Sequence, residues 1–208
     1  RQMCIRDRCD EDMKKVFTRL PSSSAIPLAV RRAQDMFVLM FLLRGLPFVD
    51  LAYLRKSDLR DNVITYRRRK TGRPLSVTLT PEALELLKKY MNRDSHSPYL
   101  FSLLKSGEGT KEAYREYQLA LRSFNQQLTL LGEVLGLNDK LSSYTARHTW
   151  ATTAYYCEIH PGIISEAMGH SSIKVTETYL KPFRNKKIDE ANNQIIDFVK
   201  HSIAGVVS

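Results

Sequence analysis

The chain has 208 residues and carries 32 Lys and Arg against 22 Asp and Glu, a formal net charge of +10. Apolar residues make up 43%, with only 9 Gly and 8 Pro, which excludes a disordered or collagen-like chain and allows one sizeable core. No window approaches the roughly 18 apolar residues of a membrane span, so we expect a soluble protein without a membrane partner. Three scattered cysteines exclude a disulfide framework and fit the cytoplasm.

Residues 1–25 precede the first predicted core element. Met3–Asp7 resembles a translated sequencing adapter, and our hypothesis is that residues 1 to about 8 are an assembly scar followed by a polar linker. On this hypothesis the protein begins further upstream, an upstream domain is missing, and this chain is the C-terminal part. We then expect one domain over 26–183 and a tail helix over 184–208, which either packs on its own domain or docks on a neighbouring protomer.

Apolar spacing and helix breakers predict a mostly α fold with a small antiparallel β-sheet (α+β). Helices are predicted at 28–43, 48–54, 81–91, 111–134, 144–156, 161–168, 172–180 and 184–203. Two strands, 62–68 and 74–79, flank the turn Lys70–Gly72, so a lysine lies at the tip of a basic hairpin. Apolar and polar residues alternate from Leu75 to Thr80, which predicts one buried face of the second strand.

Basic residues cluster in two segments, 60–73 and 181–187. The first segment holds six cations against a single acid, Asp61. Two such clusters favour a polyanionic partner over a merely solvated surface, and we predict that this partner is a nucleic acid.

Breaking a DNA strand without metal or ATP requires a nucleophile that keeps the phosphate bond energy, cations around the pentacoordinate phosphorus and an acid for the leaving 5' oxygen. Tyr179 is a candidate nucleophile, since neighbouring cations favour its ionised phenol. Arginine suits the phosphate oxygens because its planar fork is always charged. Lys70, at the hairpin tip, can protonate the leaving group. The histidines show no HxH or HExxH spacing, so we expect no metal and no other cofactor.

Several segments in order resemble the signature of the tyrosine recombinases of the phage integrase family. They are Gly45–Leu51, Lys70–Gly72, Tyr144–Thr152, Met168–Ser172 and Thr176–Tyr179. The family's box around its first arginine, its lysine turn, HxLRHTFAT, LGHSS and the segment of the nucleophilic tyrosine occur in the same order. Tyr179 lies nine positions after His170, as in the family. The resemblance covers about residues 28–182 and implies the fold of the recombinase catalytic domain.

The resemblance also implies the roles of the candidate site residues. Tyr179 would attack the phosphodiester to form a 3'-phosphotyrosyl bond, Arg147 would stabilise the phosphorane, and Lys70 would act as the general acid. His170 would assist the phosphate and the tyrosine proton. DNA contacts are assigned to Arg67, Arg68, Arg69, Arg73, His148, Lys174 and Lys181. The family further implies a homotetramer on two DNA duplexes.

Two positions depart from the family pattern. Pro47 stands where the first arginine of the catalytic set belongs, and Tyr144 replaces the histidine of the HxxR motif. Arg44 lies three residues before Pro47, and our hypothesis is that its side chain reaches the same phosphate. Tyr144 can hydrogen-bond a phosphate but cannot carry a proton near neutral pH. Bacteroides-type integrases of mobile elements also lack the usual first arginine, which favours an active site-specific recombinase.

Two alternatives stay open. The first alternative to a recombinase is a DNA-binding module that has lost catalysis, and the second is a type IB topoisomerase-like enzyme that relaxes supercoils without a partner site. The target sequence and the direction of recombination are not encoded in these motifs.

Overall fold

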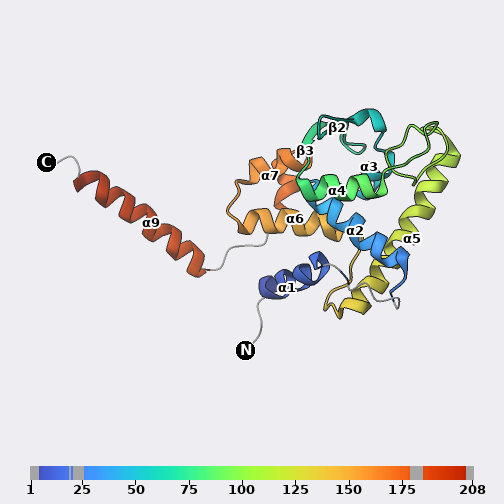
Figure 1. The fold of residues 1–208 in the computed structure, drawn as a ribbon. Coiled ribbons are helices and arrows are strands. Elements are labelled where there is room, and N and C mark those ends of the chain that lie inside the picture. The colour runs from blue at the N-terminus through green and yellow to red at the C-terminus, as the bar shows by residue number, and fades with distance from the viewer. Residues whose placement is uncertain (1–4, 19, 21–25, 179–184, 205–208) are drawn as a thin grey trace.

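The computed structural model describes residues 5–18, 20, 26–178 and 185–204. Helices dominate this part of the chain, with one small antiparallel sheet beside them, as the sequence predicts (Figure 1). The helices are α1 (Ile5–Phe17), α2 (Leu28–Leu42), α3 (Phe48–Tyr53), α4 (Pro81–Tyr90), α5 (Lys111–Leu135), α6 (Thr145–Tyr156), α7 (Pro161–Met168), α8 (Ile173–Glu177) and α9 (Asn185–Ala204). The predicted boundaries agree to within one or two residues, except that the predicted end of α8 lies outside the described residues.

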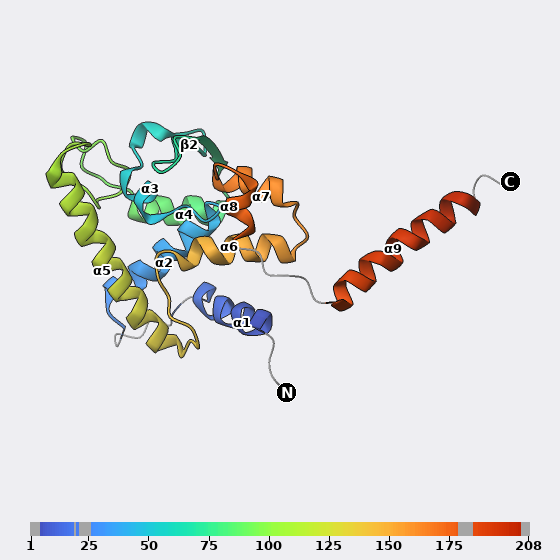
Figure 2. The same cartoon turned by 180° about the vertical axis from the view of Figure 1, so that it is seen from behind.

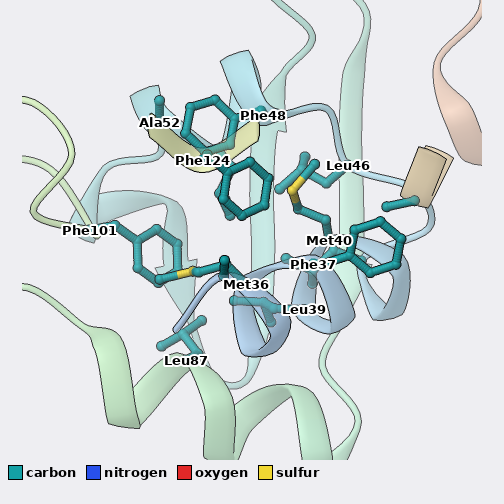
Figure 3. Close-up of a cluster of buried hydrophobic side chains, with 14 of the residues drawn as sticks. Met36, Phe37, Leu39, Met40, Leu46, Phe48, Ala52, Leu87, Phe101 and Phe124 are labelled. Carbon is teal, nitrogen blue, oxygen red and sulfur yellow. The ribbon is translucent and has the colours of Figure 1, made fainter. Parts of the chain in front are cut away.

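Helix α2 lies at the centre of the core because its second half, from Met36 onward, is apolar nearly all round. It packs against α1, α4, α5 and α6, and its side chains Met36, Phe37 and Met40 are fully or almost fully buried. Figure 3 shows these side chains beside residues from α3, α4 and α5. Burial of such side chains contributes about 1.5–3 kcal/mol each relative to exposure, so α2 is the scaffold on which the other helices rest.

The sheet has three antiparallel strands in the order β1 (Leu59–Arg60), β2 (Val63–Arg67) and β3 (Pro74–Thr78), preceded by a short 3-10 helix at Lys56–Asp58. Ile64 pairs with Val77 in the β2–β3 register, and both side chains are buried. The polar residues that alternate with Val77 are exposed, which confirms the predicted two-sided strand. The sheet therefore rests on the core through one face.

Helices α6, α7 and α8 form the end of the domain nearest to the hairpin (Figures 1 and 2). A small apolar cluster joins α6 to α7 through Ala151, Ile164 and Met168. Gly169 ends α7 in the left-handed conformation, with φ 64°. This confirms the predicted helix stop, and it turns the chain sharply between α7 and α8.

The structure differs from the expected linker at the N-terminal end. Ile5–Phe17 forms helix α1, and Val16 is fully buried. The buried Gln34 of α2 donates two hydrogen bonds of 2.8 Å, to the carbonyls of Val16 and Thr18. These contacts attach α1 to the core, although α1 itself is a charged sequence with few apolar residues.

Helix α9 lies apart from the remaining helices in both views (Figures 1 and 2). Several of its apolar side chains are exposed, including Ile195 (63%) and Phe198 (74%). The helix itself, Asn185–Ala204, agrees with the one predicted from the apolar spacing. Among the described residues, no helix is long and apolar enough to cross a membrane.

Candidate active site

Arg147 occupies the first turn of α6 and is 3% exposed. Its guanidinium donates hydrogen bonds to two main-chain carbonyls, from Nη1 to Gly45 (2.9 Å) and from Nη2 to Met168 (2.7 Å). A buried guanidinium held at two edges has a fixed plane, because both bonds would have to break before it could rotate. The site thus joins the turn after α2 to the end of α7.

The turn after α2 is shaped by two consecutive residues with positive φ, Arg44 (59°) and Gly45 (68°). A Cβ on Gly45 would lie 2.9 Å from Cα of Arg147. Only glycine permits this close approach, since real Cβ atoms do not come so near to backbone. The glycine therefore lets α6 pack directly on the turn.

His170 follows the Gly169 stop and is 4% exposed. Its Nδ1 lies 2.8 Å from the hydroxyl oxygen of Thr176 in α8. Burial lowers the pKa of His170 to about 4, and the positive charges of Arg147, Arg68, Lys70 and Arg73 add to this effect. The imidazole is consequently neutral at physiological pH in the DNA-free protein.

The tip of the β2–β3 hairpin lies against the turn between α7 and α8. Thr71 donates a hydrogen bond from its hydroxyl to the carbonyl of Gly169 (3.0 Å), and the Nη2 of Arg73 lies 3.5 Å from the carbonyl of Ser171. The predicted turn is closed by a bond from the Gly72 amide to the Arg68 carbonyl (2.7 Å). Lys70 is exposed at this tip, and its charge acts on His170.

Arg68 is buried, with 5% exposure, rather than projecting from the hairpin like its neighbours. Its Nη1 forms an ion pair with Oδ2 of the buried Asp50 in α3, and the other oxygen of Asp50 accepts the amide of Arg69 at 3.0 Å. Asp50 thus fixes one edge of the Arg68 guanidinium and also holds the backbone of the next residue. The inward direction of Arg68 continues the alternation of Ile64 and Tyr66, a signal present in the sequence.

Arg69 belongs to a second charged group on the outer side of the hairpin. It forms an ion pair with Glu108, which also binds Arg55 at 2.5 Å, and its guanidinium lies 3.8 Å from the ring centre of Tyr53. These residues border a polar pocket of about 260 Å³ that Arg67 also lines. Sequence reasoning missed Glu108 because no local pattern links that loop to the hairpin.

The remaining predicted residues are placed differently. Arg44 is half-buried, and its Nη1 lies 3.3 Å from the carbonyl of Ser76 on β3. Tyr144 precedes α6 and is 56% exposed, while His148 and Lys174 are exposed. Two predicted residues, Tyr179 and Lys181, lie outside the described residues. The structure thus gathers Arg147, His170, Lys70, Arg73 and Arg68 around the α7–α8 turn.

No group of three or more His, Cys, Asp or Glu side chains within the described ranges is arranged to hold a metal ion. The charged and titratable side chains near the α7–α8 turn include the guanidinium group of Arg147, the imidazole of His170 and the ammonium group of Lys70. These groups suit an anionic ligand, because arginine donates in a planar fork and lysine supplies a compact charge.

Comparison with known proteins gives a consistent picture. The model of the phage integrase family matches residues 19–186. The tyrosine recombinase XerA of Pyrococcus furiosus is 26% identical over 176 residues, which cover 83% of this chain and 56% of the relative. The tyrosine recombinase XerC of Haemophilus ducreyi is 28% identical over 134 residues, 62% of this chain and 42% of the relative. The chain thus spans about half the length of the curated relatives it matches.

Solved structures share the fold. The crystal structure of XerA recombinase superposes with a TM-score of 0.59 at 20% identity, covering 89% of this chain and 63% of that one. The Tn1549 transposon integrase in complex with transposon right end DNA gives 0.60 at 15% identity, with coverages of 91% and 64%. A lambda integrase dimer bound to a core site gives 0.52 at 20%, with coverages of 81% and 56%.

Proposed function

The chain belongs to the phage integrase family, and from this premise we propose that it cleaves and rejoins DNA strands as a site-specific tyrosine recombinase. In this proposal Tyr179 attacks a DNA phosphodiester. A bond forms between its phenol oxygen and phosphorus, the bond to the 5' oxygen breaks, and the DNA is held as a 3'-phosphotyrosyl ester. The 5'-hydroxyl of a second strand then reverses the step.

One observation carries this proposal: three segments far apart in sequence meet at the α7–α8 turn. Arg147 binds the carbonyl of Met168 at 2.7 Å, Thr71 binds the carbonyl of Gly169 at 3.0 Å, and the next residue, His170, is buried. A guanidinium, an imidazole and the lysine-bearing hairpin thereby surround one short backbone stretch. Preorganised donors of this kind stabilise charge that develops on a phosphate during transfer.

The electrostatics support different proton-transfer roles for Lys70, as a donor, and His170, as an acceptor. Lys70 is exposed and can give its proton to the leaving 5' oxygen. His170 has a pKa lowered to about 4 by burial and by adjacent cations. A neutral imidazole is able to accept the phenol proton of Tyr179, and a protonated one is not.

We also propose a DNA partner, an oligomeric state and a cellular compartment for the protein. The substrate is double-stranded DNA in the cytoplasm, bound by a homotetramer on two duplexes, and residues 26–183 form the catalytic domain. The exposed apolar side chains of α9, among them Ile188 and Phe198, fit docking on a neighbouring protomer. The curated relatives are longer than this chain, consistent with a second domain that would complete the grip on DNA.

A covalent-trapping experiment tests the function. The protein is mixed with a pool of nicked duplexes that carry randomised flanks, so that the cleaved strand loses the fragment needed for religation. We expect a denaturation-resistant protein–DNA adduct that Tyr179→Phe abolishes. Binding without any adduct would instead indicate a non-catalytic DNA-binding module.

A second assay separates recombination from supercoil relaxation. The sequences recovered from the adducts are placed twice on one supercoiled plasmid and once on a control plasmid. A recombinase rearranges the two-site plasmid and leaves the segments of the one-site plasmid in place. A topoisomerase relaxes both plasmids and rearranges neither.

A further inference from the structure

Position 47 supplies no guanidinium to the candidate active site. Transfer of an anionic phosphoryl group places negative charge on two non-bridging oxygens, and Arg147 is a single buried guanidinium. Pro47 occupies the position of the other motif arginine and serves as the residue before α3. A proline side chain donates no hydrogen bond, so any second guanidinium must come from elsewhere in the chain.

Arg68 enters the same region from the hairpin. Its side chain crosses Gly169 so closely that a Cβ on that glycine would lie 2.8 Å from Cγ of Arg68. Glycine suits this position for a second reason as well, because its φ of 64° lies in the left-handed region that other residues rarely adopt. Arg68 therefore lies beside the residue that immediately precedes His170.

The guanidinium of Arg68 is anchored at one edge only. Nη1 pairs with the buried carboxylate of Asp50. Among the residues that the structure describes, the buried Nε has no hydrogen-bond partner. A buried N–H donor without an acceptor is costly, by about 1–3 kcal/mol, and an anionic ligand at this place would remove that cost.

Arg68 and Arg147 flank the same three-residue stretch. Arg147 binds the carbonyl of Met168, and Arg68 lies against Gly169. Both charges act on His170, and both also act on the half-buried phenol of Tyr66. The two guanidinium groups thus share one electrostatic environment at the end of α7.

We propose that Arg68 is a catalytic residue that supplies the second guanidinium to the scissile phosphate, from the hairpin instead of from position 47. This inference rests on the proposed function. Asp50 holds one edge of the fork, as a carboxylate commonly does for arginine, and the opposite edge faces the phosphate. The ion pair with Asp50 also prevents the side chain from turning back into solvent.

Arg44 is the competing source of this charge. Its guanidinium bonds the carbonyl of Ser76 on the exposed side of β3, and its backbone φ of 59° makes it part of the turn. Arg68 is more deeply buried and contacts Gly169 directly. The geometry therefore favours Arg68 over Arg44.

The test compares two substrates that differ in one charge. A nicked duplex carries at the cleaved position either the natural phosphodiester or a methylphosphonate, in which a methyl group replaces one charged non-bridging oxygen. With the phosphodiester, we expect Arg68→Ala to form adduct on the order of 100-fold more slowly than the unchanged protein. With at least one methylphosphonate diastereomer, we expect the rates of adduct formation by the two proteins to differ by less than about threefold. The neutral phosphonate lacks the negative charge that the guanidinium of Arg68 would stabilise, so loss of that guanidinium has little effect.

Control variants make the result specific. Arg93→Ala changes an exposed arginine outside the site and should match the unchanged protein on both substrates. The double substitution Asp50→Asn/Arg68→Gln removes both charges of the ion pair, so that no buried charge is left alone. If Arg68→Ala does not fold, this double variant takes its place in the same comparison. Arg44→Ala is assayed in parallel.

The outcomes are separable. Loss on the phosphodiester with recovery on the methylphosphonate supports the assignment. Equal losses on both substrates in a folded variant, normal cleavage by Arg68→Ala, or recovery seen for Arg44→Ala instead would overturn it. Absence of adduct from the unchanged protein would reject the recombinase function itself.

Discussion

Gly45 is the residue on which the position of Arg147 most directly depends. Its φ is +68°, and an added Cβ would meet Cα of Arg147 at 2.9 Å. We predict that Gly45→Ala destabilises the fold by about 1–2 kcal/mol through the left-handed backbone, and by a further 1–3 kcal/mol or so through overpacking. Displacement of Arg147 should also slow adduct formation by about 100-fold.

Gly136 provides a matched control for this prediction. It also has a left-handed backbone, with φ of +57°, but an added Cβ would meet no atom within 4 Å. Gly136→Ala should therefore show only the backbone cost and leave adduct formation unchanged. Chemical denaturation and the nicked-substrate assay measure both quantities. Equal destabilisation by the two substitutions would show that the contact with Arg147 is unimportant.

His170 makes the stability of the domain depend on pH. Burial and adjacent cations lower its pKa to about 4 in the folded protein, against an ordinary value near 6.5 in the unfolded chain. Between these values the unfolded chain binds more protons, so the free energy of unfolding decreases as the pH falls from about 6.5 to 4. We predict that His170→Gln flattens this part of the profile, measured by urea denaturation at pH 7.0, 6.0 and 5.0.

The carboxylates of the chain titrate in the same range but are common to both proteins, so the difference between the two profiles isolates His170. Parallel profiles would contradict the lowered pKa. A direct check is the NMR titration of the His170 ring, which should stay neutral at pH 6 without DNA. Bound phosphate should raise its pKa, since an anion favours the imidazolium.

At the scale of secondary-structure elements, the ion pair of Asp50 and Arg68 fastens the hairpin to α3. Both side chains are almost fully buried. Removing one partner of a buried pair leaves an uncompensated charge and typically costs about 3–5 kcal/mol. We predict a loss of this size for Asp50→Asn, measured as the change in free energy of unfolding.

Asp35 supplies the control for this element-level prediction. It pairs with Lys89 at 2.6 Å, but the two side chains are 20% and 52% exposed. Ion pairs in such surroundings contribute about 1 kcal/mol or less, so Asp35→Asn should cost little. Similar losses for the two substitutions would mean that the hairpin does not depend on the buried pair.

The elements that the sequence predicts well are those whose signals are local. Thr80 caps α4 by accepting the amide of Ala83 at 3.2 Å, and Gly136 and Gly169 end α5 and α7 in the left-handed conformation. The hairpin follows from alternation around the Lys70–Gly72 turn. Each of these features depends on residues only a few positions apart, so the sequence alone is sufficient.

The features that sequence reasoning missed depend on distant partners. Helix α1 gains its place from two hydrogen bonds donated by Gln34 and from the burial of Val16. Glu108 joins the hairpin across 39 residues of chain to reach Arg69. The burial of Arg68 requires Asp50, which is 18 residues away. Local patterns cannot reveal such partnerships, and these contacts are what shape the candidate site.

On the scale of the whole molecule, the net charge of +10 can attract an anionic partner only where the cations are exposed. The hairpin presents Arg67, Lys70 and Arg73 on its exposed surface, while Arg68 is buried and Arg69 is paired with Glu108. Neighbouring arginines in one short segment thus lie in different environments. The exposed ones are suited to phosphate contacts that set binding strength, and the buried one is suited to the reacting phosphate.

This division predicts a particular salt dependence of DNA binding. Each phosphate contact releases condensed counterions, and loss of one contact reduces the slope of log affinity against log salt by about 1. In a Tyr179→Phe background, which prevents covalent trapping, Arg67→Ala should reduce the slope by that amount. Arg93→Ala, which changes an exposed arginine outside the hairpin, should leave it unchanged. Fluorescence anisotropy between 50 and 200 mM salt gives both slopes, and equal slopes for the two variants would place the DNA away from the hairpin.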